Sequence, residues 1–325
     1  MPTADDYILT TFHITGKAGQ EPVDIDDTLG SVLIQHGNLQ DAASWLAGFG
    51  DDHKPFQLQL VDEGYDIWLG NNRGTEYSQG HVTLSSDDAE FWDFDWTAMG
   101  MYDDPANIKA IKEATGQDKI QYIGYSQGTV QMHYALAHDE DNFYGESLHR
   151  VIQLAPCFYP NVPNLIWNTI SAGTMRLHEF GVHSLFGKNW EQDLETICDN
   201  VDAFTCGHYR GLTGSQPISV KSEQYWAQLG MNNGFFEPVT MEQWANGVYH
   251  GDAIDVSKID QVPMSFFIGG SDNLCKANFA NEYISQMHTT TEVWTISGEG
   301  HSYFSGDNYT ASFMNHIVQH LDLHW

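Results

Sequence analysis

Residues 119–137, KIQYIGYSQGTVQMHYALA, decide which fold this chain can adopt. Residues 119–124 are apolar and partly β-branched and have no polar face, which is typical of a strand buried on both sides of a parallel sheet. Residues 129–137 are rich in helix formers. The stretch therefore predicts a buried strand, a tight turn and a helix in direct succession.

The turn in this stretch has the sequence GYSQG, in which Gly124 and Gly128 flank Ser126. Glycine has no Cβ, so the chain can bend very tightly on both sides of the serine. We expect Ser126 to be strained, with its hydroxyl above the carboxyl end of the sheet and the helix N-terminus aimed at the same place. The five residues alone also fit a glycine-rich loop with a solvated serine, but the flanking strand and helix favour a nucleophile.

The rest of the chain alternates apolar segments with helical ones, which indicates an α/β fold with a mostly parallel central sheet flanked by helices. Strands are predicted at residues 7–15, 31–35, 65–69, 150–154, 262–268 and 292–296. Helices are predicted at residues 41–49, 56–63, 105–114, 278–287 and 311–322.

The alternation of strands and helices disappears between residues 159 and 260, where Trp, Phe, Met, Gly and Asn are interspersed without clean periodicity. We interpret this segment as a mainly helical cap or lid inserted into a core formed by residues 1–158 and 261–325. An independent domain is the alternative, but no linker-like stretch bounds the segment.

Ser126, Asp272 and His301 each follow a predicted strand, in the chain order nucleophile, acid, base. Because the carboxyl ends of parallel strands meet at one edge of a sheet, we expect the three side chains to gather there. A serine hydroxyl needs an imidazole to take its proton, and the imidazole needs a carboxylate to fix its tautomer. This order is that of the α/β-hydrolase fold.

Two backbone N–H groups are candidates for an oxyanion hole. Asn38 follows a strand that ends in His36-Gly37, the usual place for one donor in serine hydrolases of this topology, and Gln127 follows the candidate nucleophile. An ordinary strand-to-helix turn is the alternative for Asn38.

Arg73, in the loop after residues 65–69, is expected to brace loops rather than touch substrate. No H-E-x-x-H or C-x-x-C pattern exists, so neither a metal site nor a cofactor is expected.

The charge balance is extreme, with 13 Lys and Arg against 44 Asp and Glu among 325 residues, a formal net charge of −31. Nucleic acid and anionic membrane surfaces are repelled by such a chain, and no apolar run is long enough for membrane insertion. The charge fits either an acidic compartment, with an acid-shifted pH optimum of activity, or a solubilising surface in a salty medium.

No signal peptide precedes the predicted first strand, which fits a mature form with an added Met or a cytosolic chain.

Cysteine is sparse, and the four residues permit three pairings. Cys198 and Cys206 are close in sequence, so a short closed loop between them is one possibility. Free thiols in a reducing compartment are the alternative. The sequence leaves the pairing of Cys157 and Cys275 open.

At this point the residues resemble the acid lipase family, the group that contains gastric lipase and lysosomal acid lipase. The resemblance covers nearly the whole chain, and the motif GYDIWLGNNRG is the most specific part. The matching motifs are QHG at residues 35–37, GYDIWLGNNRG at 64–74, FWDF at 91–94, YDDPA at 102–106 and SQGT at 126–129.

The resemblance implies an α/β-hydrolase core with a helical cap and a movable lid. It implies hydrolysis of triacylglycerols or sterol esters at an oil–water interface, a triad at Ser126, Asp272 and His301, and oxyanion donors at Asn38 and Gln127. It also implies a cap disulfide between Cys198 and Cys206 and a secreted or lysosome-like location.

The chain departs from the family pattern at two positions near the candidate site. Tyr125 stands where these lipases usually have His, and Asn38 is polar where Leu is usual.

The expected function is that of a serine lipase acting through an acyl-enzyme, most simply a triacylglycerol lipase. A sterol-ester hydrolase, a soluble short-chain esterase or thioesterase, and a non-catalytic binding module are the alternatives. Acyl length, alcohol preference and oligomeric state are open.

Overall fold

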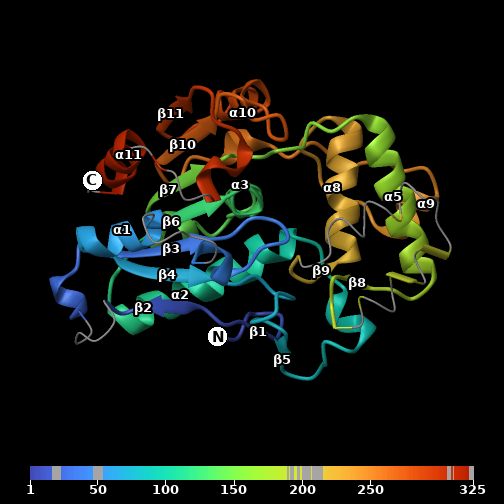
Figure 1. The fold of residues 1–325 in the computed structure, drawn as a ribbon, viewed down its shortest axis with the longest axis horizontal. Helices are drawn as coiled ribbons and strands as arrows, with labels where there is room; N and C mark the ends of the chain where they lie inside the picture. Colours follow the sequence, from blue (N-terminus) through green and yellow to red (C-terminus); the bar gives the residue numbers. More distant parts are fainter. Residues whose placement is uncertain are drawn as a thin grey trace.

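A seven-stranded sheet forms the centre of the protein in a computed structural model that describes residues 1–16, 23–46, 54–188, 190, 194–195, 198–199, 206, 215–305, 309 and 311–321. The strand order is β11-β10-β7-β6-β3-β4-β2 (Figure 1), and all neighbours are parallel except β2, which is antiparallel to β4. The strands are β2 Phe12–Ile14, β3 Ser31–Gln35, β4 Asp66–Gly70, β6 Ile120–Tyr125, β7 Leu148–Leu154, β10 Met264–Gly269 and β11 Thr291–Ile296. The predicted α/β class with a mostly parallel sheet is confirmed.

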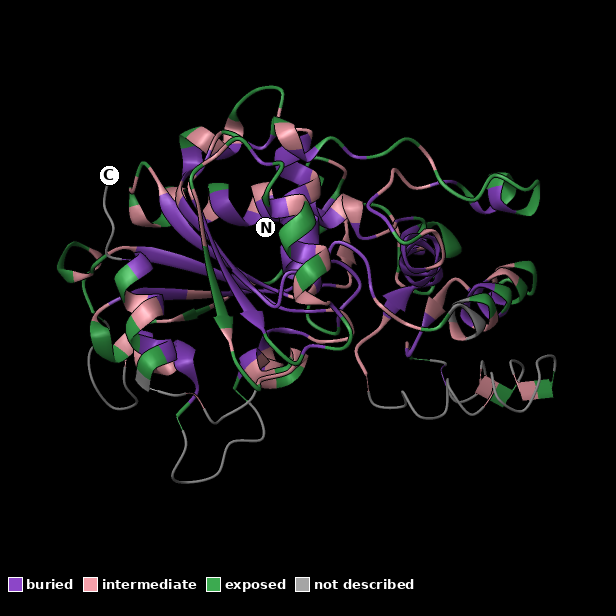
Figure 2. Cartoon of the chain, turned by 90° about the horizontal axis from the view of Figure 1, so that it is seen from above, coloured by how far each residue is buried: buried purple, intermediate pink, exposed green. Residues whose placement is uncertain are grey.

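Helices cover both faces of this sheet, and neighbouring strand residues point into different cores. Tyr122 and Phe266 pack in one hydrophobic cluster, whereas Ile123 and Phe267 pack in the other, because successive side chains in a strand point to opposite faces. Figure 2 shows the central strands as almost entirely buried. The helices of the first face include α2 Asp104–Thr115, α3 Gln127–Ala137 and α10 Ala277–Ile284, and those of the second are α1 Phe56–Glu63 and α11 Ala311–Leu321.

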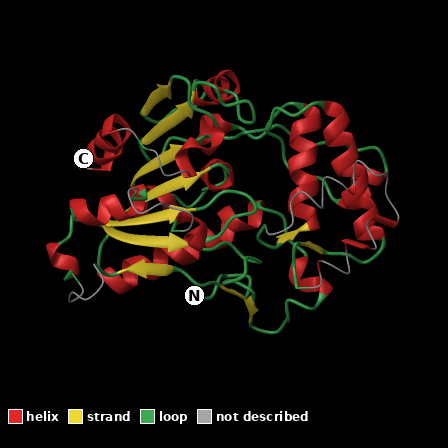
Figure 3. Cartoon of the chain, viewed as in Figure 1, coloured by secondary structure: helices red, strands yellow, loops and turns green. Residues whose placement is uncertain are grey.

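A group of helices lies beyond the carboxyl ends of the strands, to the right in Figures 1 and 3. It contains α5 Asn164–Glu179, α8 Val220–Asn232 and α9 Met241–Ala245, with a short antiparallel pair of β8 Ser184–Leu185 and β9 Ile218–Ser219. Part of this group packs around its own small apolar cluster, which includes Leu177, Phe186 and Trp190. The cap boundaries at residues 159 and 260 stay a prediction. Within the described residues, no helix combines the length and apolarity that a bilayer crossing requires.

The sequence predicts a single strand over residues 7–15, and this prediction is wrong. The segment forms β1 Tyr7–Ile8, which pairs with β5 Gly80–His81, and then the separate strand β2. Between β1 and β2, side chains form the hydrogen bonds of the backbone. The N–H of Thr10 donates to Ser78 Oγ, and the carbonyl oxygen of Thr10 accepts from Asn71 Nδ2. These bonds replace the ladder that a continuous strand needs.

The predicted helix at 41–49 is also different where the structure describes it. It is a single 3₁₀ turn, η2 Ala42–Trp45, closed by the C-cap Leu46, and residues 47–49 lie outside the described residues. The expected N-cap is correct, because Asp41 accepts from the N–H of Ser44, and the Ser44 hydroxyl in turn accepts from the N–H of Asp41.

Candidate active site

Ser126 lies at the sharp turn between β6 and α3. Its backbone has φ 50° and ψ −111°, a conformation that side-chain-bearing residues rarely adopt. Glycine is required at both flanking positions because neighbouring backbone atoms leave no room for a Cβ atom. A Cβ on Gly124 would lie 2.5 Å from the carbonyl oxygen of Gly128, and a Cβ on Gly128 would lie 2.7 Å from that of Gln35. The turn therefore has the geometry of a nucleophile elbow.

The structure brings the three candidate catalytic side chains together. His301 Nε2 lies 2.8 Å from Ser126 Oγ, and His301 Nδ1 lies 2.7 Å from Asp272 Oδ2. Asp272 follows β10, and His301 begins the 3₁₀ turn η6 His301–Ser305 after β11. Because β6, β7, β10 and β11 are consecutive in the sheet, their carboxyl ends deliver all three residues to one edge.

The carboxylate of Asp272 is held in a fixed orientation. Its Oδ1 accepts hydrogen bonds from the N–H groups of Leu274 and Cys275, at 2.9 and 2.8 Å, which leaves Oδ2 for the imidazole. Cys275 forms a disulfide with Cys157, and the N–H of Cys157 donates to Thr129 Oγ1 on α3. The loop that carries the acid is therefore tied to the helix that follows the serine.

The two predicted oxyanion donors come from different segments: Asn38 follows β3, and Gln127 directly follows Ser126. Within the described part of the chain, the N–H groups of Asn38 and Gln127 donate no hydrogen bond. Gln127 is the first residue of α3, where N–H groups have no partner inside the helix. The lack of a partner among the described residues is compatible with the predicted role of both N–H groups as oxyanion donors.

His36 fixes the loop that carries Asn38. Its Nδ1 donates to the carbonyl oxygen of Gly37 at 2.8 Å, and its Nε2 accepts from the N–H of Asn72 at 3.1 Å. Burial lowers the pKa of His36 to about 4, so the imidazole is neutral at physiological pH. The two bonds require the Nδ1-protonated tautomer, and they join the loop to the segment after β4.

Tyr125 occupies the space between the two loops of the site. Its hydroxyl donates to the carbonyl oxygen of His301 at 3.3 Å and accepts from Ser305 Oγ at 3.2 Å. On its other side, the ring lies 3.0 Å from where a Cβ on Gly37 would be. Burial raises the pKa of Tyr125 to about 12, so it is un-ionised. The Tyr at this position therefore supports the loops of both the base and the oxyanion donor.

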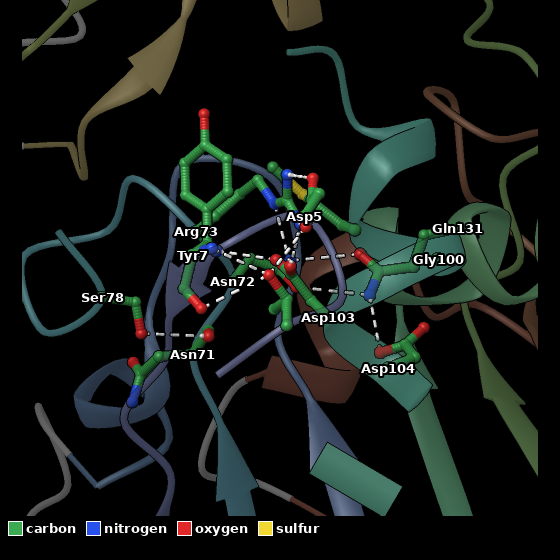
Figure 4. A network of polar contacts seen from close by, with 12 residues as sticks. Asp5, Tyr7, Asn71, Asn72, Arg73, Ser78, Gly100, Asp103, Asp104 and Gln131 are labelled. Atoms are coloured by element: carbon green, nitrogen blue, oxygen red, sulfur yellow. Dashed lines mark hydrogen bonds and ion pairs between the residues drawn. The ribbon is translucent and has the colours of Figure 1, made fainter. Parts of the chain in front are cut away.

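Arg73 lies in a buried polar network (Figure 4). Its side chain is 1% exposed; it contacts Asp103 at 2.7 Å and Asp5 at 2.6 Å, and its guanidinium stacks 4.0 Å from the ring centroid of Tyr7. The neighbouring Asn72 carries the N–H that reaches His36. The prediction that Arg73 braces loops is confirmed, and the network secures the loop on which His36 depends.

Replacement of Arg73 by Met is expected to lower the free energy of unfolding by about 3–5 kcal/mol, because it leaves the carboxylate of Asp103 buried and unpaired. Burial raises the pKa of Asp103, and Arg73 counteracts that rise. Urea denaturation at neutral pH measures the loss.

Two further variants control this measurement. Arg73→Met combined with Asp103→Asn should recover at least about 1 kcal/mol, because the amide oxygen still accepts from the N–H of residue 73 and no charge is stranded. Arg176→Met, at an exposed ion pair, should change stability by less than about 0.5 kcal/mol. Equal losses for Arg73→Met and Arg176→Met would contradict the assigned role of Arg73.

The cysteines are paired in two disulfides, Cys157–Cys275 and Cys198–Cys206. Asp272, Cys275 and His301 lie within 4.8 Å of one another, a cluster of metal-ligating residue types. The sulfur of Cys275 is bonded to Cys157, however, and the Asp272 and His301 side chains are bonded to each other. The cluster is therefore accounted for without a metal ion.

Comparison with known proteins supports the interpretation of this geometry. Residues 30–175 match the family model described as alpha/beta hydrolase fold. Gastric triacylglycerol lipase of Rattus norvegicus is 30% identical over an alignment of 307 residues, and the match covers 84% of this chain and 74% of that lipase. Lipase member K of Mus musculus is 28% identical over an alignment of 305 residues, and the match covers 90% of this chain and 72% of that protein.

A solved structure shows the same fold across the whole chain. A soluble variant of monoglyceride lipase from Saccharomyces cerevisiae superposes with a TM-score of 0.59 at 15% identity, covering 100% of this chain and 96% of that one. Together with the similarity to gastric lipase over most of both chains, this establishes that the protein belongs to the acid lipase family of α/β hydrolases and is a carboxylic ester hydrolase.

Proposed function

We propose that this protein hydrolyses lipid esters through a serine acyl-enzyme, with Ser126 as nucleophile, His301 as general base and Asp272 as the residue that orients His301. His301 takes the proton of Ser126 as its oxygen attacks the ester carbonyl. The N–H groups of Asn38 and Gln127 bind the oxyanion of the tetrahedral intermediate. His301 then protonates the departing alcohol, and a water molecule activated by His301 cleaves the acyl-enzyme.

The observation that carries this proposal is the chain of two short contacts from Ser126 Oγ through the imidazole to Asp272. Contacts of 2.8 and 2.7 Å are hydrogen-bonding distances, and they lie in the order that base catalysis requires. Oδ1 of Asp272 is already occupied by two N–H groups, which favours the tautomer of His301 that carries its proton on Nδ1. That tautomer leaves Nε2 free to accept the serine proton.

The substrate class is proposed from the relatives and from the cap. Gastric triacylglycerol lipase is named for triacylglycerol, so triacylglycerol is the first substrate to test, with sterol esters as the alternative. We propose that residues 159–260 form a cap that covers the acyl chain and excludes water during the reaction. Two disulfides favour an oxidising compartment, such as the exterior of the cell or a lysosome-like organelle.

The test combines covalent labelling with a lipid-water interface. A fluorophosphonate is expected to label Ser126 alone among the serines, as identified by peptide mass spectrometry. Hydrolysis of tributyrin is expected to rise steeply when its concentration passes the solubility limit. Labelling together with a smooth saturation curve through that limit would instead indicate a soluble esterase. Absence of both labelling and hydrolysis would overturn the proposed activity.

A comparison of esters distinguishes the two lipid classes. Rates on a long-chain triacylglycerol and on a cholesteryl ester, dispersed in the same detergent, are expected to favour the triacylglycerol. A higher kcat/KM for the cholesteryl ester would make sterol esters the substrate class, while the proposed roles of Ser126 and His301 would be unaffected.

A further inference from the structure

One face of the helix α8 contacts both segments that carry the proposed oxyanion donors. Trp226 Nε1 donates to Gln127 Oε1 at 3.1 Å, and the side chain of Glu223 lies beside that of Asn38. Glu223 and Trp226 are three residues apart in α8, so their side chains share a face of the helix. Close to the start of α8, the N–H of Gln216 donates to the carbonyl oxygen of Leu39 at 3.1 Å.

Glu223 is an unusual residue to find in this contact. It is 8% exposed, and its Oε2 atom is buried with no hydrogen-bond partner among the described residues. A buried carboxylate without a cation is strongly unfavourable, whereas a neutral carboxyl group in the same place costs far less. The burial of Glu223 therefore favours the protonated acid. The family resemblance leads one to expect Leu at position 38, so this polar pair is a feature of this chain.

We propose that Glu223 and Trp226 are positioning residues that hold the peptide units of Asn38 and Gln127 in place for the oxyanion, and that Glu223 does so only when it is protonated. The proposal rests on the hydrolytic function proposed above. It makes α8 a proton-dependent support of the oxyanion hole: the helix packs firmly on the site in acid and loosens as the carboxyl group ionises.

The direction of the pH effect follows from burial. Burial raises the pKa of Glu223 from 4.5 to about 7, and the polar side chain of Asn38 partly opposes the rise. The packed state of α8 therefore binds the proton more tightly than a loosened state in which Glu223 meets water. The packing is fully stabilised below pH 4.5 and weakens as pH rises through 7. The equilibrium changes by at most on the order of 300-fold over this range.

Other ionisable groups near α8 do not account for this behaviour. Among the described residues of α8 and of the segments packed near it, these groups are His36, Asp41, Glu90, Asp93, Asp95, Arg176, His178, Glu179, His183, Lys221 and Glu237. Burial raises the pKa of Glu223 and the side chain of Asn38 lowers it, and no charged group contributes. Lys221, the nearest cation along the helix, is paired with Asp93.

Hydrogen exchange of the full chain tests the proposal directly. After correction for intrinsic exchange rates, protection of the α8 amides in the wild type is expected to fall by at least about tenfold between pH 4.5 and 7.5. In Glu223→Gln, whose side chain has nearly the same shape and cannot ionise, protection should not change over this range. Glu242→Gln, at an exposed residue of α9, should behave as the wild type. A pH-independent wild type, or the same fall in Glu223→Gln, overturns the proposal.

Kinetics on a soluble short-chain ester provide the second readout. At pH 5 the wild type and Glu223→Gln should have similar kcat. At pH 8 the kcat of Glu223→Gln is expected to be at least about tenfold higher than that of the wild type, with KM unchanged. This difference lies within the roughly 10²–10³-fold loss of kcat that removal of an oxyanion donor causes. Trp226→Phe should lower kcat at every pH and keep the wild-type dependence of α8 protection. Identical kcat–pH profiles for the wild type and Glu223→Gln contradict the proposal.

The outcome is separable from that of the hydrolase proposal. Fluorophosphonate labelling of Ser126 at pH 6 is scored in the wild type and each variant before the profiles are compared. Labelling with unchanged profiles rejects only the role of Glu223 and Trp226. Absence of labelling in every variant rejects the hydrolytic mechanism, and the exchange measurement then still decides whether Glu223 controls the packing of α8.

Discussion

The Ser126→Ala variant is expected to lose about six orders of magnitude in kcat for a soluble ester, while its melting temperature stays within a few degrees of the wild type. Without the hydroxyl no acyl-enzyme forms, and only direct attack by water on an ester held by the oxyanion donors remains. Alanine has the Cβ of serine and no other group, so the strained turn at φ 50° is not made worse. Stopped assays on a chromogenic ester, with calorimetry of the same sample, measure both quantities.

A matched serine controls for nonspecific effects of the substitution. Ser302 lies next to His301 in sequence and is exposed, so Ser302→Ala should retain activity within about twofold. Ser126→Ala should also lose all fluorophosphonate labelling, whereas Ser302→Ala should keep it. More than about 1% residual activity in Ser126→Ala, after exclusion of contaminating esterases, would remove Ser126 as the nucleophile.

The parts of the site that the sequence predicts are those with local signals. A buried strand followed by a glycine-flanked serine and a helix needs no information from the rest of the chain, and the structure has this order from Ile120 to Ala137. Asp272 and His301 each follow an apolar strand, and the parallel arrangement of these strands brings the two side chains to Ser126. Local patterns and one topological rule were sufficient to assemble these three residues.

The features that the sequence did not reveal depend on contacts between distant segments. Cys157 and Cys275 flank the predicted cap, 118 residues apart, and nothing in their spacing identifies them as partners. Likewise, Glu223 lies in a segment without clean periodicity, and its burial against Asn38 depends on how α8 packs on the core. The polar residue at position 38 was the available signal, because a polar side chain beside a closed site needs a partner.

Asp272→Asn is expected to lower kcat by about 10⁴ with little change in folding, and the reason lies in which nitrogen of His301 carries the proton. Oδ1 of Asp272 accepts from two N–H groups, so the oxygen of an asparagine will occupy that position and its NH₂ group will face His301 Nδ1. An NH₂ donor requires Nδ1 to be an acceptor, which moves the imidazole proton to Nε2. A protonated Nε2 cannot take the proton of Ser126, although all distances stay nearly the same.

The rate of fluorophosphonate labelling is the decisive measurement for Asp272→Asn, because labelling requires an activated serine but no release of product. We expect labelling and kcat to fall together, while KM and the unfolding midpoint stay close to those of the wild type. Asp260→Asn, at an exposed carboxylate, should leave all four quantities unchanged. If Asp272→Asn keeps more than about a tenth of the wild-type labelling rate, the carboxylate does not control the tautomer of His301, and another group must orient the base.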